Sequence, residues 1–164
     1  MKGKGMSDTR LRTRSAVHDE VTRWFFDDYL PTWVGVGAGT ITRGPEFILD
    51  YWSAPLYFST EQGGGYLLGA SDVIGFLQQI HVRLRGEGYA KTAVPDRNVT
   101  VYHDFGAAID VIWSRCRADD SEIERLAAHF ELARGYAGWR IVGVQTAATD
   151  ADSLAAHGNL IATL

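Results

Sequence analysis

The histidines are the side chains of this sequence best suited to proton transfer, because imidazole titrates near neutral pH. There are five of them: His18, His81, His103, His129 and His157. His81 borders the apolar stripe of a predicted helix, and Asp28 borders the aromatic face of another. A histidine beside a carboxylate can act as a general acid or base. We therefore predict His81 and Asp28 as a catalytic pair, with Tyr57 as the other polar partner expected within reach of His81. A structural hydrogen-bonded pair and a solvent-facing histidine are the alternatives.

Aromatic side chains are the second chemical resource of the chain, which has five Trp and seven Tyr. Aromatic rings with polar tips are good walls for a flat, mostly apolar ligand. The candidate ligand-binding residues are Trp24, Tyr29, Trp52, Tyr57 and Trp113.

Metal and nucleotide chemistry find little support in the sequence. No two histidines have the close helical spacing typical of a zinc site. Two histidines and a carboxylate, namely His81, His129 and Asp28, form a metal site only if the fold brings them together. The glycine run 35–39 does not match a dinucleotide-binding fingerprint, because no strand precedes it and Thr40 occupies the position of the sixth-position glycine. The run therefore indicates a loop. We expect no metal and no cofactor.

Helical patterns dominate the first half of the chain. A helix is predicted to begin at Ser15 and to end before Pro31, followed by a loop over 32–42. A short helix is predicted over 45–53 and a longer one from Ser71 to Leu84, closed by glycines.

Strand patterns dominate the second half. A first strand over 56–60 and a glycine turn over 61–65 precede the long helix. Four alternating segments joined by tight turns follow it, at 98–103, 107–117, 122–134 and 139–147. Helices segregated ahead of an antiparallel sheet predict the α+β class.

Side-chain alternation assigns faces to these strands. It places Trp113 on the core face of its strand, and His129 on the outer face of the next. Both faces of 139–145 are largely apolar, since simple alternation puts Ile141 and Val144 on opposite sides. An apolar outer face predicts a homodimer through the sheet.

The overall composition limits the class of protein. The 164 residues have a formal net charge of −4 and are 46% hydrophobic, which fits one compact domain over 15–147. Residues 1–14 are predicted to be a disordered basic tail, and 148–164 a C-terminal tail with one helical turn. The acidic domain disfavours nucleic acid. No apolar run is long enough for a membrane span, and a lone Cys116 forms no internal disulfide. We expect a cytoplasmic protein.

Three stretches of the sequence resemble the nuclear transport factor 2-like superfamily, which includes the SnoaL-like polyketide cyclases and the ketosteroid isomerases. They are VTRWFFDDYL, FILDYWSAPLYFST and HFELARGYAGWRIVGVQ. The resemblance implies a strongly curved antiparallel sheet wrapped around N-terminal helices into a cone. It also implies an apolar pocket at the open end and frequent dimerisation through the sheet. Function is not settled by this fold, because it serves enzymes and binding proteins alike.

The acid–base residues of ketosteroid isomerases have no counterpart in this sequence. The resemblance places Trp24 at their tyrosine, and Ser59 and Ala128 at their two aspartates. Steroid-type isomerisation is therefore not expected. Two hypotheses follow. The first is a pocket protein for a flat, mostly apolar small molecule, whose catalytic version is a cofactor-free cyclase, dehydratase or isomerase. The alternative is a non-catalytic dimeric scaffold with a filled pocket.

Overall fold

The computed structural model describes the backbone of residues 4–162 and the side chains of residues 14–158. It begins with one continuous helical rod in three segments: α1 (Lys4–Arg23), the π-helical turn η1 (Trp24–Tyr29) and α2 (Leu30–Ala38). Of the stretch predicted as a disordered tail, residues 4–14 are the first turns of this rod, and 1–3 lie outside the described residues.

A widened turn carries this helix past the proline predicted to end it. The Leu30 N–H donates to the carbonyl of Phe25, five residues back, as in a π-helix. Pro31 then lies at the start of α2, where its missing N–H costs least. The helix ends at Gly39, whose φ of 82° is left-handed. The loop predicted over 32–42 is thus wrong for its first seven residues.

The glycines of α2 allow close packing rather than a flexible loop. A Cβ on Gly37 would lie 3.0 Å from Nε2 of His81, and one on Gly35 would lie 2.4 Å from Cδ1 of Ile41. The absence of side chains at these two positions lets α2 approach α3 and its own following loop.

The remaining elements form one sheet and three further helical segments. They are the 3₁₀ helix η2 (Pro45–Asp50), β1 (Trp52–Thr60), β2 (Gly63–Leu67), α3 (Ala70–Gly86), β3 (Tyr89–His103), β4 (Gly106–Arg117), β5 (Glu122–Gly135), β6 (Gly138–Ala148) and α4 (Leu154–Ala162). The short helix ends earlier than predicted, β3 begins nine residues earlier, and Gly63–Leu67 is a strand where a turn was expected.

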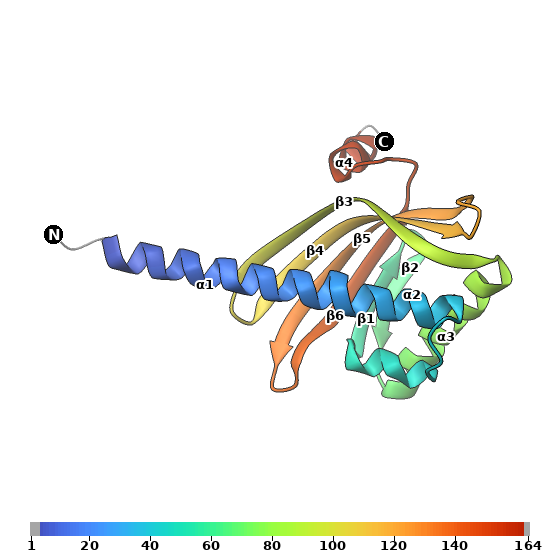
Figure 1. Cartoon of the computed structure of the whole chain (residues 1–164), viewed down its shortest axis with the longest axis horizontal. Coiled ribbons are helices and arrows are strands. Elements are labelled where there is room, and N and C mark those ends of the chain that lie inside the picture. Colours follow the sequence, from blue (N-terminus) through green and yellow to red (C-terminus); the bar gives the residue numbers. More distant parts are fainter. Residues whose placement is uncertain (1–3, 163–164) are drawn as a thin grey trace.

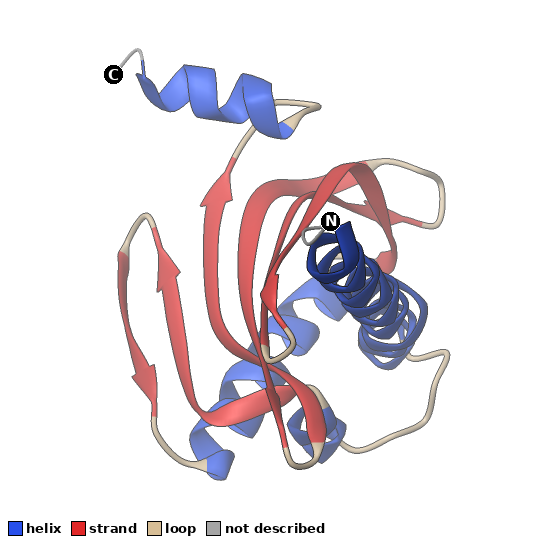
Figure 2. Ribbon diagram, turned by 90° about the vertical axis from the view of Figure 1, so that its left-hand side faces the viewer, coloured by secondary structure: helices blue, strands red, loops and turns tan. Residues whose placement is uncertain are grey.

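The sheet has the order β2-β1-β6-β5-β4-β3 and curves around the helical rod (Figures 1 and 2). Neighbouring strands are antiparallel except β1 and β6, which are parallel. The predicted α+β class and the curved sheet wrapped around N-terminal helices are therefore confirmed, with the parallel β1–β6 pair as a correction to a wholly antiparallel sheet. The core lies between the concave face of the sheet and the helices.

An extra residue in β6 changes which of its side chains face the core. Adjacent residues of β5 pair with Ile141 and Gly143, so Val142 is additional. A bulge of this kind reverses the alternation along a strand. Trp139, Ile141 and Val144 are accordingly all buried in the core. The predicted placement of Ile141 and Val144 on opposite faces is wrong, because Val144 joins the core face.

The C-terminal segment forms a nine-residue helix, which is more than the one turn predicted. The Leu154 N–H donates to Oδ2 of Asp96 in β3, and Nδ1 of His157 bonds the Thr149 hydroxyl. Helix α4 thereby lies beside the outer face of the sheet, where Asp110 and His129 share a groove with Leu154 and His157.

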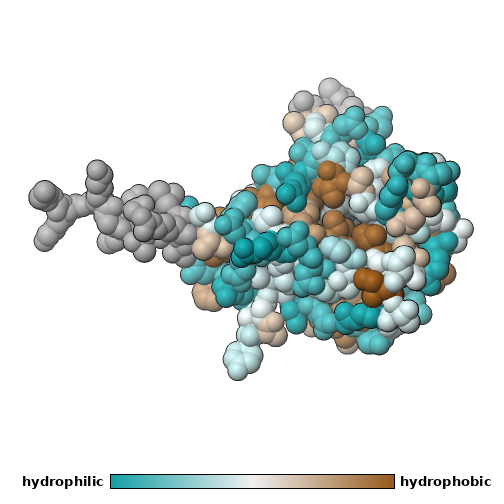
Figure 3. Space-filling view, viewed as in Figure 1, coloured by the Kyte–Doolittle hydropathy of each residue, from teal (hydrophilic) through white to brown (hydrophobic). Residues whose placement is uncertain are grey.

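Among the described residues, the large apolar side chains that are exposed are Ile41, Tyr66, Leu68, Val82, Tyr102, Phe105 and Tyr136. On the face seen in Figure 3, hydrophilic residues predominate and apolar ones form separate spots. Among the described helices, none is both long enough and apolar enough to cross a membrane.

Candidate functional site

A cavity of about 540 Å³ lies between the helices and the concave face of the sheet. This volume is in the range of small-molecule sites, roughly 300–1,000 Å³. Most of the lining is aromatic or aliphatic, and the polar part consists of two arginines, two glutamates and a few smaller groups. The lining residues are Tyr29, Leu30, Trp33, Trp52, Phe58, Thr60, Glu61, Gln62, Phe76, Ile80, Arg83, Thr92, Trp113, Arg115, Glu124, Leu126, Phe130, Val144, Thr146 and Ala148.

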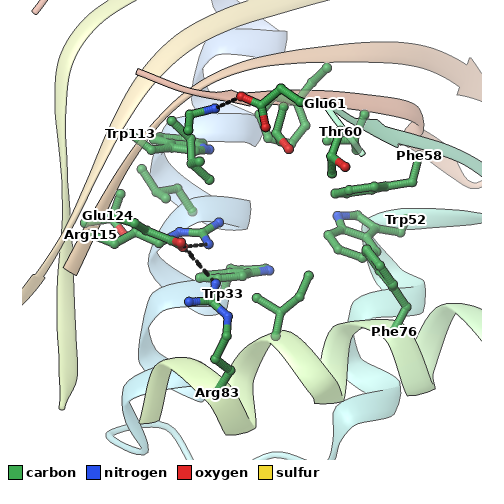
Figure 4. Close-up of a pocket in the computed structure, with 18 of the residues that line it drawn as sticks. Trp33, Trp52, Phe58, Thr60, Glu61, Phe76, Arg83, Trp113, Arg115 and Glu124 are labelled. Carbon is green, nitrogen blue, oxygen red and sulfur yellow. Dashed lines mark hydrogen bonds and ion pairs between the residues drawn. The ribbon is translucent and has the colours of Figure 1, made fainter. Parts of the chain in front are cut away.

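Burial separates the floor of the cavity from the exposed part of its lining. The floor consists of buried aromatic residues, among them Trp33, Trp52 and Trp113 (Figure 4). The exposed part of the lining includes Glu61 and Gln62 of the β1–β2 turn and Arg83 of α3. The exposed lining residues are thus mostly polar, and the buried ones are largely aromatic or aliphatic.

Tyr29 places a hydroxyl group on the floor. The indole Nε1–H of Trp52 donates to its oxygen at 3.1 Å. Complete burial raises the pKa of this phenol well above its usual value, more than the hydrogen bond from Trp52 lowers it. The hydroxyl therefore stays protonated and keeps its own hydrogen to donate.

Two arginines hold one glutamate in the cavity wall. Nη1 of Arg115 donates to Oε1 of Glu124 at 2.7 Å, and Nη2 of Arg83 donates to both carboxylate oxygens at 3.0 and 3.1 Å. Burial alone would raise the pKa of Glu124, but the hydrogen bonds and charges of both arginines outweigh it and lower that pKa. Glu124 is thus an ionised structural group with its acceptor capacity largely used.

Trp33 has an unsatisfied donor in this wall. The residue is 5% exposed, and its Nε1 is buried without a hydrogen-bond partner. The guanidinium carbon of Arg115 lies 4.8 Å from the centroid of the indole, which fixes the ring by a cation–π contact. Figure 4 shows the nitrogen-bearing edge of Trp33 turned toward the open part of the cavity.

Three of the five predicted ligand-binding residues line the cavity: Tyr29, Trp52 and Trp113. Trp24 is outside the lining and stacks on Tyr29, with ring centroids 6.3 Å apart. Tyr57 is also outside it and packs edge-on against Tyr66 of β2, at 5.3 Å. Neither Trp24 nor Tyr57 touches a molecule held in this cavity as it stands.

The predicted catalytic pair is not assembled. His81 is buried outside the cavity lining, with its ring 4.4 Å from that of Trp33 and its Nε2 without a partner, so neither Asp28 nor Tyr57 bonds it. Burial, followed by the charges of Arg115 and Arg85, lowers the pKa of His81 to about 4.

Asp28 lies elsewhere, exposed, where it accepts a 2.8 Å hydrogen bond from the Tyr51 hydroxyl. The helix stripe correctly indicated that His81 is close to the core. The direction of its ring depends on how α2 crosses α3, which the sequence does not show.

The residues considered for a metal site are also apart. His129 bonds Asp110 at 2.8 Å and Glu131 at 3.2 Å on the outer face of the sheet, far from the core position of His81. Within the described residues, no cluster of three or more His, Cys, Asp or Glu side chains is arranged to hold a metal ion.

Sequence reasoning missed the charged residues of the cavity wall, although a signal was present. Arg115 follows Trp113 by two positions in β4, so alternation puts it on the same core face. Glu124 likewise precedes Leu126 by two, and the two charged residues are direct neighbours across β4 and β5. An arginine and a glutamate paired on the core face of a sheet indicate a buried polar site.

Comparison with known proteins places these features in a family. A family described as "NTF2-like protein (DUF6841)" matches residues 19–149. No curated protein matches the sequence.

Solved structures share the fold at low sequence identity. An NTF2-like protein with a cystatin-like fold from Novosphingobium aromaticivorans is 22% identical, covers 98% of both chains and has a TM-score of 0.63. The protein Aln2 from a Streptomyces species is 14% identical over 90% of this chain and 95% of that one, with a TM-score of 0.59. A structure described as a putative ketosteroid isomerase from Parabacteroides distasonis is 9% identical over 71% of this chain and 83% of the other, with a TM-score of 0.52.

At these identities the structural likeness concerns the fold alone. The family match covers most of the chain, and the cone of curved sheet and helices agrees with it, as the resemblance implied. This protein belongs to the NTF2-like family DUF6841.

Proposed function

We propose that the protein binds a small, flat, mostly apolar molecule in the cavity between its helices and the concave face of the sheet. The observation that carries the proposal is the cavity itself, about 540 Å³ with three buried tryptophans in its wall. Aromatic walls and a few fixed polar groups are typical of small-molecule sites. The alternative hypothesis of a scaffold with a filled pocket is disfavoured by this open volume.

The cavity supports binding better than acid–base catalysis. Its lining contains neither His81 nor Asp28. Glu124 is held ionised by two arginines, and the pKa of Tyr29 is raised by burial, so neither exchanges a proton readily near neutral pH. The proposal is therefore a binding function, and the cyclase, dehydratase or isomerase version of the hypothesis gains no support from these groups.

Equilibrium dialysis against 2-isopropenylnaphthalene tests the proposal, because this probe is flat and apolar. We expect saturable binding of one probe per chain. Replacing Ile80, in the cavity wall on α3, by tryptophan should fill part of the cavity and weaken binding at least tenfold.

Val82→Trp is the matched control for this experiment. Val82 is on the same helix, is 64% exposed and is outside the lining. It should leave the affinity unchanged. Absence of saturable binding to the unmodified protein, or equal binding by Ile80→Trp, contradicts the proposal.

A further inference from the structure

We propose that the ligand presents a neutral carbonyl oxygen to the indole N–H of Trp33, with the Tyr29 hydroxyl as a second donor on the same helix face. This inference rests on the proposed binding function and specifies the chemical class of the ligand.

The unpartnered nitrogen of Trp33 is the first observation. Buried donors in folded proteins are nearly always hydrogen-bonded, because leaving one unpaired is unfavourable. Among the described side chains, only Trp33 Nε1 and His81 Nε2 are buried without a partner. His81 Nε2 faces the backbone of Gly37, whereas the Trp33 edge is turned toward the cavity (Figure 4). A ligand acceptor at this edge would satisfy the donor.

A second donor belongs to the same face of the helical rod. Tyr29 precedes Trp33 by four residues, and side chains with this spacing are neighbours on a helix. Its hydroxyl accepts the hydrogen bond from Trp52, so its own hydrogen is not used in that bond. Both residues line the cavity, and a ligand oxygen with two lone pairs can accept two hydrogen bonds.

The two carboxylates of the lining are already engaged in other hydrogen bonds. Glu124 already receives three hydrogen bonds from Arg83 and Arg115. Glu61 is exposed, and its Oε1 accepts from the Ala148 N–H at 2.6 Å. Neither carboxylate therefore partners the two donors, which leaves them for an acceptor on the ligand.

The charges of the lining favour a neutral ligand over an anion. Arg83 and Arg115 are the cations, and Glu61 and Glu124 the anions, so the charged lining residues balance. A carboxylate ligand would bring an unpaired negative charge into a largely apolar site, which is unfavourable. A ketone-type oxygen needs only the two neutral donors.

Equilibrium dialysis with matched probes tests the inference. 2-Acetylnaphthalene and 2-isopropenylnaphthalene have nearly the same shape and differ in the carbonyl oxygen, and 2-naphthoate carries a charged oxygen instead. We expect the ketone to bind about tenfold tighter than the alkene, the size of one or two net hydrogen bonds. We expect the naphthoate to bind more weakly than the ketone.

Variants assign this preference to its donor. Trp33→Phe keeps an aromatic ring but removes the N–H, and should reduce the ketone-to-alkene ratio at least threefold; Tyr29→Phe should reduce it in the same direction. Ile80→Val is the control, because it enlarges the same cavity without removing a donor, and should leave the ratio unchanged. The ratio cancels changes in shape common to both probes, and circular dichroism checks that each variant is folded.

The outcomes separate the two proposals. A ketone-to-alkene ratio near one, a ratio unaffected by Trp33→Phe, or tighter binding of the naphthoate would overturn the inference while leaving the binding function in place. Failure of every probe to bind would instead refute the binding function, and the inference with it.

Discussion

Acidification should destabilise this protein through the buried imidazole of His81. The pKa of this side chain is lowered to about 4, first by burial and then by the charges of Arg115 and Arg85. In the unfolded chain its pKa has the ordinary histidine value of ~6.5. The stability that comes from the neutral ring is thus complete above the unfolded pKa and is lost as the pH falls from there toward the folded pKa.

The size of the effect follows from the difference between the two pKa values. Each tenfold difference in proton affinity corresponds to ~1.4 kcal/mol. The pKa of about 4 therefore predicts a loss of about 3 kcal/mol of unfolding free energy between pH ~7.5 and ~4. His81 is only 5% exposed, so solvent screening should reduce this value little.

Urea denaturation followed by tryptophan fluorescence measures the loss, with His81→Phe as the comparison. Phenylalanine does not titrate and fits the aromatic surroundings, where Trp33 and Phe47 flank the ring. Carboxylates also titrate in this range, so the informative quantity is the stability of the unmodified protein minus that of the variant at each pH.

This difference should fall by about 3 kcal/mol over the acid range. A constant offset between the two curves would show that His81 protonates as readily in the folded state as in the unfolded one, and would refute the reasoning.

His129→Gln is a second comparison, in which the pH dependence of stability should have the opposite sign. Burial lowers the pKa of His129, but the hydrogen bonds and charges of Asp110 and Glu131 outweigh burial and raise that pKa. The contribution of His129 is therefore present in acid and is lost as the pH rises through its folded pKa.

Three further predictions concern the core, the cavity wall and the assembly. Phe25→Ala should cost about 3–5 kcal/mol in chemical denaturation, because Phe25 is fully buried between Trp113 and Phe130; a cost near zero would contradict its place in the core. Arg115→Met should lower the unfolding free energy by about 2 kcal/mol, because a charged hydrogen bond to Glu124 is lost. A double variant that also has Glu124→Gln should recover part of this loss. No recovery would mean that the two residues are not coupled. A homodimer through the outer sheet face stays a prediction, which sedimentation velocity at micromolar concentration tests and a monomer contradicts.

The sequence predicted most of the sheet because alternation follows half-buried strands directly. The strand expected at 107–117 is Gly106–Arg117, and the one at 122–134 is Glu122–Gly135. The errors occur where the backbone departs from regular geometry. The π-turn before Pro31 and the extra Val142 in β6 each shift the periodicity by one residue, and composition gives no sign of either.

The cavity was predictable in character but not in its polar contacts. The sequence predicts Tyr29, Trp52 and Trp113 as aromatic walls of a ligand pocket, and each lines the cavity. His81 was expected on the rim of its helix stripe and facing the pocket, yet its ring is buried in the contact between α2 and α3, where Gly37 makes room for it. Side-chain direction at a helix crossing depends on the packing angle between two helices, and one-dimensional patterns do not contain that angle.

A crystal structure of the protein with 2-acetylnaphthalene tests the central claim most directly. We predict electron density for one probe in the cavity, its rings between the aromatic walls and its carbonyl oxygen within about 3.2 Å of Trp33 Nε1, a normal hydrogen-bond distance. Density for the probe only on the outer surface, with the cavity closed by its own side chains, would contradict the account.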